Sequence, residues 1–307
     1  MNKKVIYLKK LIKKYKTITK AMIQRINFFC IIKYLFLFLV LIFLTSPFYV
    51  MIVTSLKNEN DIIQNNALSL PKSGWKFENY KSVFIIENFE FITYFLNTFT
   101  MVFFSTLLGS LCCILTAFAL SFFKFPLKKT ILMILFIGMS ITSETLILTN
   151  FRTVSNLGLV DNGNGSQIPF GVNLAMTLPY LINIVHVFLL IQAFQRVPKE
   201  LYYTAKVDGT TDWKYLWKIL FPITKASIIV VSIFRTIAAW NAYTWPELVG
   251  AKVLTNMIRK TFDIETSIDI LNIQMAISVL INLPLLIMFI MFRKYIISGE
   301  NRHGIKG

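Results

Sequence analysis

The sequence has 307 residues, of which 55% are hydrophobic, and its mean hydropathy is +0.62. This is more apolar surface than the core of a soluble domain can bury, which excludes a soluble protein and predicts an all-α integral membrane protein. Lys and Arg exceed Asp and Glu by 32 to 15, and membrane topology explains the resulting charge of +17 without a nucleic-acid partner.

Six windows are apolar over roughly 20 residues, the length that a helix needs to cross about 30 Å of hydrocarbon. The predicted spans are Tyr34–Ser55, Phe95–Phe123, Thr130–Thr149, Leu174–Phe194, Ala226–Trp245 and Ile273–Phe292. If the N-terminus is cytoplasmic, 23 of the 32 Lys and Arg lie in inside segments and 8 in outside loops. We therefore expect a multi-pass protein of the plasma or inner membrane with both termini in the cytoplasm.

This topology divides the chain into four segments. Residues 1–33 form a basic cytoplasmic segment, and 34–94 hold the first span and an extracytoplasmic loop. A transmembrane core over 95–296 includes a cytoplasmic loop at 195–225, and 297–307 form a cytoplasmic tail. The first segment carries ten basic residues and no acid, which favours either a basic helix on the anionic inner leaflet or a disordered tail that fixes topology.

Small and helix-bending residues indicate how the spans pack. Small side chains recur every four residues in the second span, at Ser105, Gly109, Cys113, Ala117 and Ser121. Such a stripe lets another helix approach closely in lipid. Prolines at 179 and 284 are expected to kink the fourth and sixth spans. The three cysteines show neither a disulfide framework nor metal-ligand spacing, so no metal is expected.

Two charges fall inside predicted spans, Glu144 in the third and Arg235 in the fifth. A charge at the bilayer centre costs about 3 kcal/mol or more, so both should face the bundle interior or a polar path. One hypothesis is that they pair or line the path together. The alternative places Glu144 near the outer mouth and pairs Arg235 with another membrane subunit. For His186 in the fourth span, packing at a helix interface is the expected role.

The loop from Glu200 to Pro222 is too polar and too long for a simple connection. Asp208-Gly209 is expected to end a first short helix, with Asp208 capping or pinning the turn and Gly209 at positive φ. Thr211 or Asp212 can cap a second helix, which should end at Pro222.

An apolar face on this second helix is expected to tie it to the bundle. The residues that form this face are Trp213, Leu216, Trp217 and Leu220. The loop could anchor the bundle at the lipid interface or dock a soluble partner. A DNA-binding helix-turn-helix is disfavoured, because the second helix would bury its Trp stripe against the membrane.

The same residues carry a resemblance to a known family. Pro198, Glu200-Leu201, Ala205, Asp208-Gly209 and Phe221-Pro222 resemble the "EAA" cytoplasmic loop of ABC importer permeases. Further matches lie at Asn97-Thr98, Leu157-Gly158-Leu159, Leu178-Pro179-Tyr180, Trp240-Asn241, Trp245-Pro246 and the C-terminal Gly304-Ile305-Lys306-Gly307. Over Tyr34 to Gly307 the chain is similar to carbohydrate permeases of the maltose and glycerol-phosphate types.

The resemblance implies a fold, partners and site residues. It implies six transmembrane helices with a cytoplasmic helix-turn-helix coupling loop between spans four and five. The implied partners are a second homologous permease, a cytoplasmic ATPase dimer that binds and hydrolyses ATP, and an extracytoplasmic solute-binding protein. This chain would be a transport subunit, with no catalytic residues or cofactor of its own. The implied ATPase-coupling residues are Glu200, Tyr203, Ala205, Asp208, Gly209, Trp213 and Pro222.

Two departures from the family pattern stand out. Tyr203, followed by Thr204, occupies the position of the motif Glu, so a charge-assisted contact to the ATPase becomes at best a phenol hydrogen bond of about 1 kcal/mol. Either the ATPase differs to match, or Glu200 and Asp208 carry the polar contacts. The third span also lacks the proline expected near Ile141 to Glu144.

The proposed path residues are Glu144, Arg235, Trp240, Asn241 and Tyr243. Rings and an amide near the outer end of the fifth span can line a sugar route, or the rings can form an interfacial belt. No phosphate-binding G-x-x-x-x-G-K-[ST] occurs, so ATP hydrolysis needs another chain. Permeation of a non-sugar solute, an ATP-independent carrier and, least favoured, an intramembrane enzyme remain alternatives.

Overall fold

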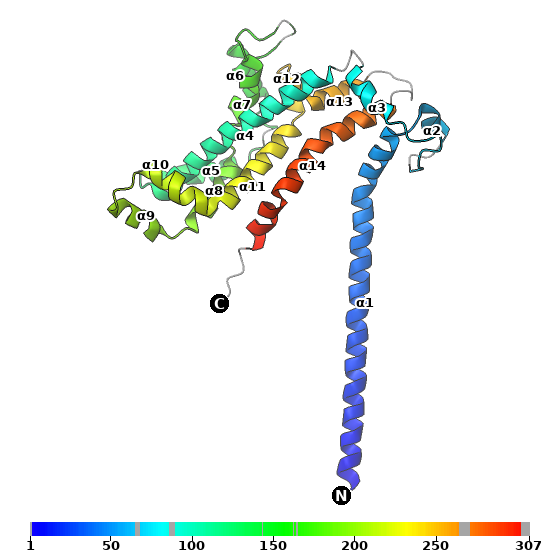
Figure 1. Cartoon of the computed structure of the whole chain (residues 1–307). Coiled ribbons are helices and arrows are strands. Elements are labelled where there is room, and N and C mark those ends of the chain that lie inside the picture. The colour runs from blue at the N-terminus through cyan, green and yellow to red at the C-terminus, as the bar shows by residue number, and fades with distance from the viewer. Residues whose placement is uncertain are drawn as a thin grey trace.

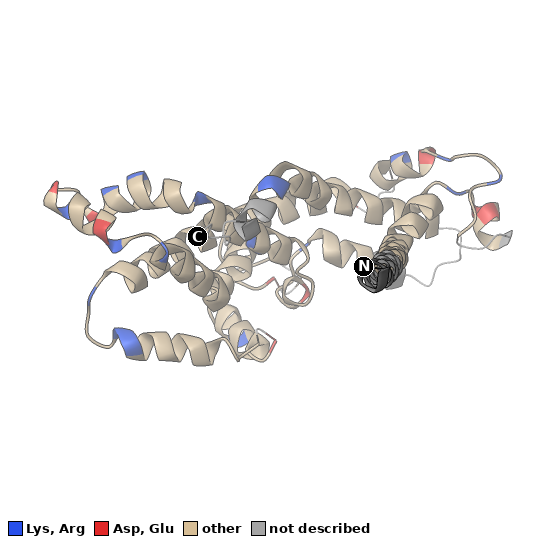
Figure 2. Cartoon of the chain, turned by 90° about the horizontal axis from the view of Figure 1, so that it is seen from below, with Lys and Arg blue, Asp and Glu red and all other residues tan. Residues whose placement is uncertain are grey.

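The computed structural model confirms an all-helical chain, since its described residues contain helices, turns and loops and no strand. The residues described are 2–64, 68–85, 90–142, 144–161, 163, 165–263 and 271–301. Among them, four helices are long and apolar enough to cross a membrane, and one bent helix pair could form a fifth crossing. Among the residues coloured in Figure 2, Lys, Arg, Asp and Glu lie mainly on the segments that connect the long helices.

Helix α1 (Asn2–Ser55) confirms the first span and extends far beyond it. It is one straight rod that stands apart from the bundle except at its C-terminal end (Figure 1). The basic N-terminal segment continues α1 as one helix, because no Gly or Pro interrupts the chain before Pro47. Whether it lies on the inner leaflet stays a prediction. Only 6% of the apolar window of α1 is buried within the chain.

Short helices α2 (Glu59–Gln64) and α3 (Glu78–Ile85) follow α1, and a buried amide network joins their region to the last helix. The Asn79 side chain donates to the carbonyls of Ser55 at 2.9 Å and Lys57 at 3.0 Å. Asn272, at the start of α14 (Leu271–Asn301), donates to Asn79 Oδ1 at 3.2 Å. These bonds fix the end of α1 against α14.

Helices α4 (Phe91–Phe122), α11 (Phe221–Trp240) and α14 pack side by side and confirm the second, fifth and sixth spans. The fifth begins earlier than predicted, because α10 (Asp212–Tyr215) and the π turn η3 (Leu216–Leu220) run directly into α11. Pro222 therefore does not end a helix. It sits in the first turn of α11, where the wider π turn before it accommodates the missing amide proton.

The predicted third span, Thr130–Thr149, is wrong as one continuous helix. Helix α5 (Lys128–Gly138) has only 11 residues, and turns separate it from α6 (Ile147–Asn156). Hydroxyl side chains dominate this break, and those of Thr142 and Thr145 bond each other at 2.9 Å. Such side chains compete for helical hydrogen bonds, so the chain bends here without a proline.

The fourth span is broken, as Pro179 predicts. Helix α7 (Gly171–Thr177) and the 3₁₀ turn η2 (Leu178–Tyr180) meet α8 (Ile184–Gln195) at an angle of 53°. Asn183 begins α8, where its side-chain oxygen accepts from the amide of His186 at 3.2 Å. In the sixth span, Pro284 lies inside an unbroken α14.

Helices α12 (Thr244–Leu248) and α13 (Leu254–Asp263) follow α11, joined by a turn at Gly250. Gly250 has φ +75, and a Cβ there would meet the carbonyl oxygen of Asp161 too closely for any carbon. The amide of Asp161 donates to Val249 at 3.1 Å, so the two loops are held backbone to backbone. Only glycine fits this contact.

We predict that Gly250→Ala lowers the free energy of unfolding by about 2–4 kcal/mol, since it combines a strained φ with a backbone clash. Thermal unfolding of the purified protein in detergent measures the effect. Gly74→Ala is the matched control: φ there is +93 but nothing lies within 4 Å of the added carbon, so about 1 kcal/mol should be lost. Equal losses in the two variants would contradict the clash.

Candidate functional site

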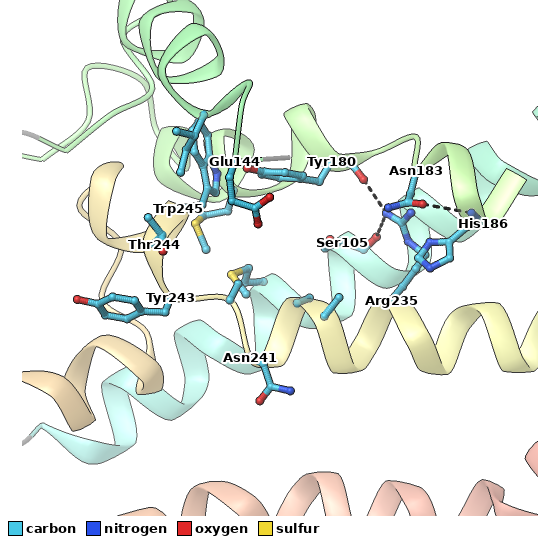
Figure 3. Close-up of a pocket in the computed structure, with 16 residues that line it drawn as sticks. Ser105, Glu144, Tyr180, Asn183, His186, Arg235, Asn241, Tyr243, Thr244 and Trp245 are labelled. Atoms are coloured by element: carbon cyan, nitrogen blue, oxygen red, sulfur yellow. Dashed lines mark hydrogen bonds between the residues drawn. The ribbon is translucent and has the colours of Figure 1, made fainter. Parts of the chain in front are cut away.

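A polar cavity of about 450 Å³ lies where the broken fourth span faces α4 and α11 (Figure 3). Its lining combines ionisable, amide and aromatic side chains. The polar and aromatic lining residues are Ser105, Glu144, Tyr180, Asn183, His186, Arg235, Asn241, Tyr243, Thr244 and Trp245.

Arg235 crosses from α11 to the break in the fourth span and is only 6% exposed. Its Nη2 donates to the carbonyls of Tyr180 at 2.9 Å and Ser105 at 3.2 Å, and its Nη1 donates to Cys113 Sγ at 3.7 Å. The carbonyl of Tyr180 lies at a helix break and needs such a donor. Arg235 thus ties α4, α11 and the broken span together.

The small-residue stripe of α4 makes room for this arginine. A Cβ on Gly109 would overlap the guanidinium of Arg235. Cys113 and Ala117 are fully buried, and α4 packs along α8 and α11. The stripe therefore admits a side chain as well as neighbouring helices, which the sequence prediction did not foresee.

Glu144 and Arg235 line the same cavity, and within the described part of the chain no ion pair joins them. Glu144 is exposed and lies at the end of the cavity away from Arg235, close to Trp245 (Figure 3). The two side chains do not pair in this structure, because the break in the third span places the carboxylate on a turn outside the helices. That they line a path together stays a prediction.

The aromatic cluster divides between two faces. Trp240 is buried on the α14 side, where its Nε1 donates to the carbonyl of Ile281 at 3.2 Å, and it does not line this cavity. Asn241 follows the end of α11, and its amide points away from Glu144 (Figure 3). Tyr243 and Trp245 do line the cavity, and Trp245 Nε1 donates to the carbonyl of Ala175 at 3.1 Å.

Several cavity residues were not predicted from the sequence to line a path, namely Ser105, Tyr180, Asn183, His186 and Thr244. The rings of Tyr180 and Trp245 pack edge to face, 5.6 Å apart. The signal for Tyr180 and Asn183 was their place just after Pro179, where a broken helix exposes polar groups.

The loop that the sequence predicts to be cytoplasmic forms a compact elbow at one end of the bundle, made of α9 (Lys199–Val207) and α10 (Asp212–Tyr215) (Figure 1). Helix α9 is followed by Asp208 as its C-cap residue and then by Gly209 with φ +72. The amide of Thr210 donates to Ala205 at 2.9 Å and that of Gly209 to Lys206 at 3.1 Å. This pair of bonds is a Schellman motif, which needs the left-handed glycine.

Asp212, rather than Asp208, pins the elbow. The Asp212 carboxylate accepts from Tyr202 at 2.7 Å and forms an ion pair with Lys206 at 2.7 Å, joining α9 to α10. Asp208 is exposed, and none of the side-chain bonds found in the described part of the chain involves it. Thr211 caps α10 by accepting from the amide of Lys214 at 3.3 Å.

The phenol of Tyr202 stays protonated throughout the physiological range. Burial, together with the hydrogen bond to Asp212 and its charge, raises the pKa of Tyr202 to about 12. Because a raised pKa keeps the O–H form, the phenol donates to the carboxylate at neutral pH and loses its proton in strong alkali.

Most of the residues predicted to couple this chain to the ATPase are exposed on the elbow, and one is buried inside it. Ala205 is buried, whereas Glu200, Tyr203, Asp208 and Gly209 are exposed. Val207, which the motif did not single out, is 87% exposed at the end of α9.

On the second helix the buried face is shifted by a residue from the predicted one. Tyr215, Leu216 and Leu220 are buried, while Trp213 is 61% exposed and stacks edge to face on Trp217, 5.6 Å between ring centres. The π turn inserts an additional residue per turn, which rotates Tyr215 inward and Trp213 outward.

A bundle of apolar helices with a polar cavity between them and a rigid elbow at one end is the architecture of a multi-pass membrane permease. No family model matches the chain. Among curated proteins, it is 28% identical to the inner membrane ABC transporter permease protein YcjP of Escherichia coli K12, covering 94% of this chain and 99% of the relative. It is likewise 28% identical to the probable ABC transporter permease protein MG189 homolog of Mycoplasma pneumoniae, over 85% of this chain and 84% of the relative.

Two further matches agree with these. The sn-glycerol-3-phosphate transport system permease protein UgpE of Brucella suis is 25% identical over 88% of this chain and 95% of its own length. A chain of a bacterial ABC transporter involved in import of the acidic polysaccharide alginate has the same fold, with a TM-score of 0.76 and 20% identity over 88% of this chain and 96% of that one. The predicted resemblance to ABC transporter permeases of the carbohydrate type is confirmed by these relatives.

Proposed function

We propose that this chain and a second homologous permease together form the membrane path for a sugar or sugar-like solute, driven by a separate cytoplasmic ATPase dimer. The observation that carries the proposal is the polar, aromatic-walled cavity beside a broken helix, in a chain similar to ABC transporter permeases. Aromatic faces suit sugar rings, and the amide and charged groups suit hydroxyls. ATP would be bound by the partner and not by this chain.

Six crossings are proposed for the assembled protein. The four long helices account for four, the bent α7–α8 pair for a fifth, and α5 with the turns after it for the remaining one. Both termini and the elbow are then cytoplasmic, in agreement with the distribution of Lys and Arg.

The elbow formed by α9 and α10 is proposed as the ATPase contact. Its inner side is fixed by Asp212 and Tyr215, so a force on its tip is passed to α11. Its outer side presents Tyr203 and the exposed apolar Val207, which suit a hydrophobic cleft in a partner better than they suit water. A neutral phenol in place of the motif Glu makes this contact less dependent on charge.

The experiment that tests the function is purification of the importer with its ATPase, followed by assay of ATP hydrolysis with a panel of solutes and the extracytoplasmic binding protein. We expect at least one sugar or sugar derivative to stimulate hydrolysis only when the binding protein is present. Flux through the isolated chain without ATP would instead identify a carrier.

Topology gives a separate prediction. In a variant with Cys30, Cys112 and Cys113 replaced by Ala, a cysteine at Val207 should react with an impermeant maleimide only from the cytoplasmic side, because position 207 is exposed on the elbow. A cysteine at Lys252, which is also exposed, should react only from outside. Labelling of both positions from the same side would contradict the proposed six crossings.

A further inference from the structure

Two polar atoms at the inner end of the cavity are buried and have no partner. They are Arg235 Nε and His186 Nδ1, and both residues line the cavity. Figure 3 shows the two side chains next to each other, beyond Tyr180 from the Glu144 end. Buried polar groups in proteins are nearly always hydrogen-bonded, so two orphans side by side indicate that a group from outside the chain belongs there.

The chemistry of Arg235 selects what that group can be. A guanidinium keeps all its protons and can only donate, so the missing partner must be an acceptor. Its other bonds go to two neutral carbonyls and a thiol, and among the described residues no carboxylate lies within ion-pair distance. A cation buried in a membrane bundle without a counter-ion is expensive, and an anionic oxygen compensates it better than a hydroxyl or a water molecule does.

The opposite end of the cavity sets a limit on the rest of the solute. Glu144 stands there with an exposed carboxylate, which repels a second negative charge and accepts hydrogen bonds from hydroxyls. Tyr180 lies between the two ends, and its ring packs edge to face against Trp245 beside Glu144 (Figure 3). The cavity therefore suits a solute with an oxyanion at one end and hydroxyls at the other.

We infer that Arg235, with His186 beside it, binds the oxyanion of an acidic sugar derivative, and that the transported solute carries a phosphate or carboxylate group. This inference rests on the proposed function and names the substrate class for the same cavity. Phosphate and carboxylate share the acceptor chemistry, so the experiment separates them.

The transport test uses proteoliposomes that contain the full importer with its binding protein. ATP-dependent uptake is compared for glucose, glucose 6-phosphate and glucuronate. We expect one of the two acidic probes to enter at least about tenfold faster than glucose, because a site built to bind a group strongly rejects the analogue that lacks it. Uptake of glucose at a rate equal to or above both acidic probes would overturn the inference while leaving the proposed function intact.

Variants then assign the effect to Arg235. Arg235→Met should lower uptake of the preferred acidic probe by about tenfold or more, and Arg235→Lys, which keeps the charge, should lower it less. Arg152→Met removes an exposed arginine on α6 and is the matched control, expected within about twofold of wild type. Loss of discrimination between acidic and neutral probes, and not merely lower uptake, separates binding from a structural role.

A measurement without transport keeps the inference testable if no solute drives uptake or if Arg235→Met assembles poorly. Sodium phosphate should raise the Tm of the wild-type complex in nanodiscs relative to sodium chloride at equal ionic strength, because a ligand of the native state stabilises it. Arg235→Lys should show a smaller rise. Identical Tm shifts in wild type and Arg235→Lys would mean that water fills the Arg235 end of the cavity or that phosphate binds as an adventitious ion only. Either result would overturn the inference. Absence of ATP-driven uptake with every probe would instead count against the proposed function.

Discussion

Replacing Asp212 with Ala should lower both solute-stimulated ATP hydrolysis and uptake by about tenfold or more. A tenfold loss corresponds to a change of about 1.4 kcal/mol in the free energy that couples the two. The carboxylate holds α9 to α10 through Tyr202 and Lys206. A hydrogen bond to a charged group contributes about 1.5–3 kcal/mol, and the partly exposed ion pair adds only about 0–1 kcal/mol. Without both, the elbow can bend instead of passing movement to α11.

The measurement is coupled ATPase and uptake assays on the assembled importer, with Lys218→Ala as the control. Lys218 is exposed on the same elbow, and its removal should leave both rates within about twofold of wild type. Tyr202→Phe should fall between the two, since it removes one of the two bonds. If Asp212→Ala were as active as Lys218→Ala, the elbow would not depend on this carboxylate for its rigidity.

Gly109→Ala should reduce uptake by about tenfold or more although it adds a single methyl group. The added carbon occupies the place of the Arg235 guanidinium, which must swing away because a helix backbone cannot. The carbonyl of Tyr180 then loses its donor, at a cost of about 1–3 kcal/mol for a buried acceptor. The broken span would lose its tie to α4 and α11.

Gly138→Ala is the control for this change. Its added carbon meets only the terminal methyl of Ile184, 2.8 Å away, which can rotate aside. Glycine to alanine within a helix also favours the helix by about 1 kcal/mol. Uptake and thermal stability are measured for both variants. Equal uptake and equal stability in the two would show that Arg235 does not need the space that Gly109 leaves for its guanidinium.

Much of this fold follows from the sequence because hydrophobic length is a strong signal. The helices at α1, α4, α11 and α14 were predicted from apolar windows alone, and Pro179 marked the bent span. The third span was misjudged because its average hydropathy hides a cluster of hydroxyl residues around Thr142, where side chains compete for the backbone. A window average cannot detect such a local conflict.

The site was less predictable, because its decisive contacts join residues far apart in the chain. Gly209 was foreseen, since a helix stop with positive φ is a local feature. That Asp212 and not Asp208 pins the elbow depends on the orientation of α9 relative to α10. The position of the Arg235 guanidinium, packed on Gly109 and bonded to the carbonyl of Tyr180, depends on how three helices pack together.

The most direct test of the account is ATP-driven uptake by the Val207→Asp variant of the assembled importer. Val207 is 87% exposed, so the change should leave membrane insertion and Tm as in wild type. A charge placed in an apolar partner cleft costs several kcal/mol, so we predict that uptake falls by about tenfold or more. Uptake at the wild-type rate, with the variant folded and assembled, would contradict the proposal that movement enters this permease through its cytoplasmic elbow.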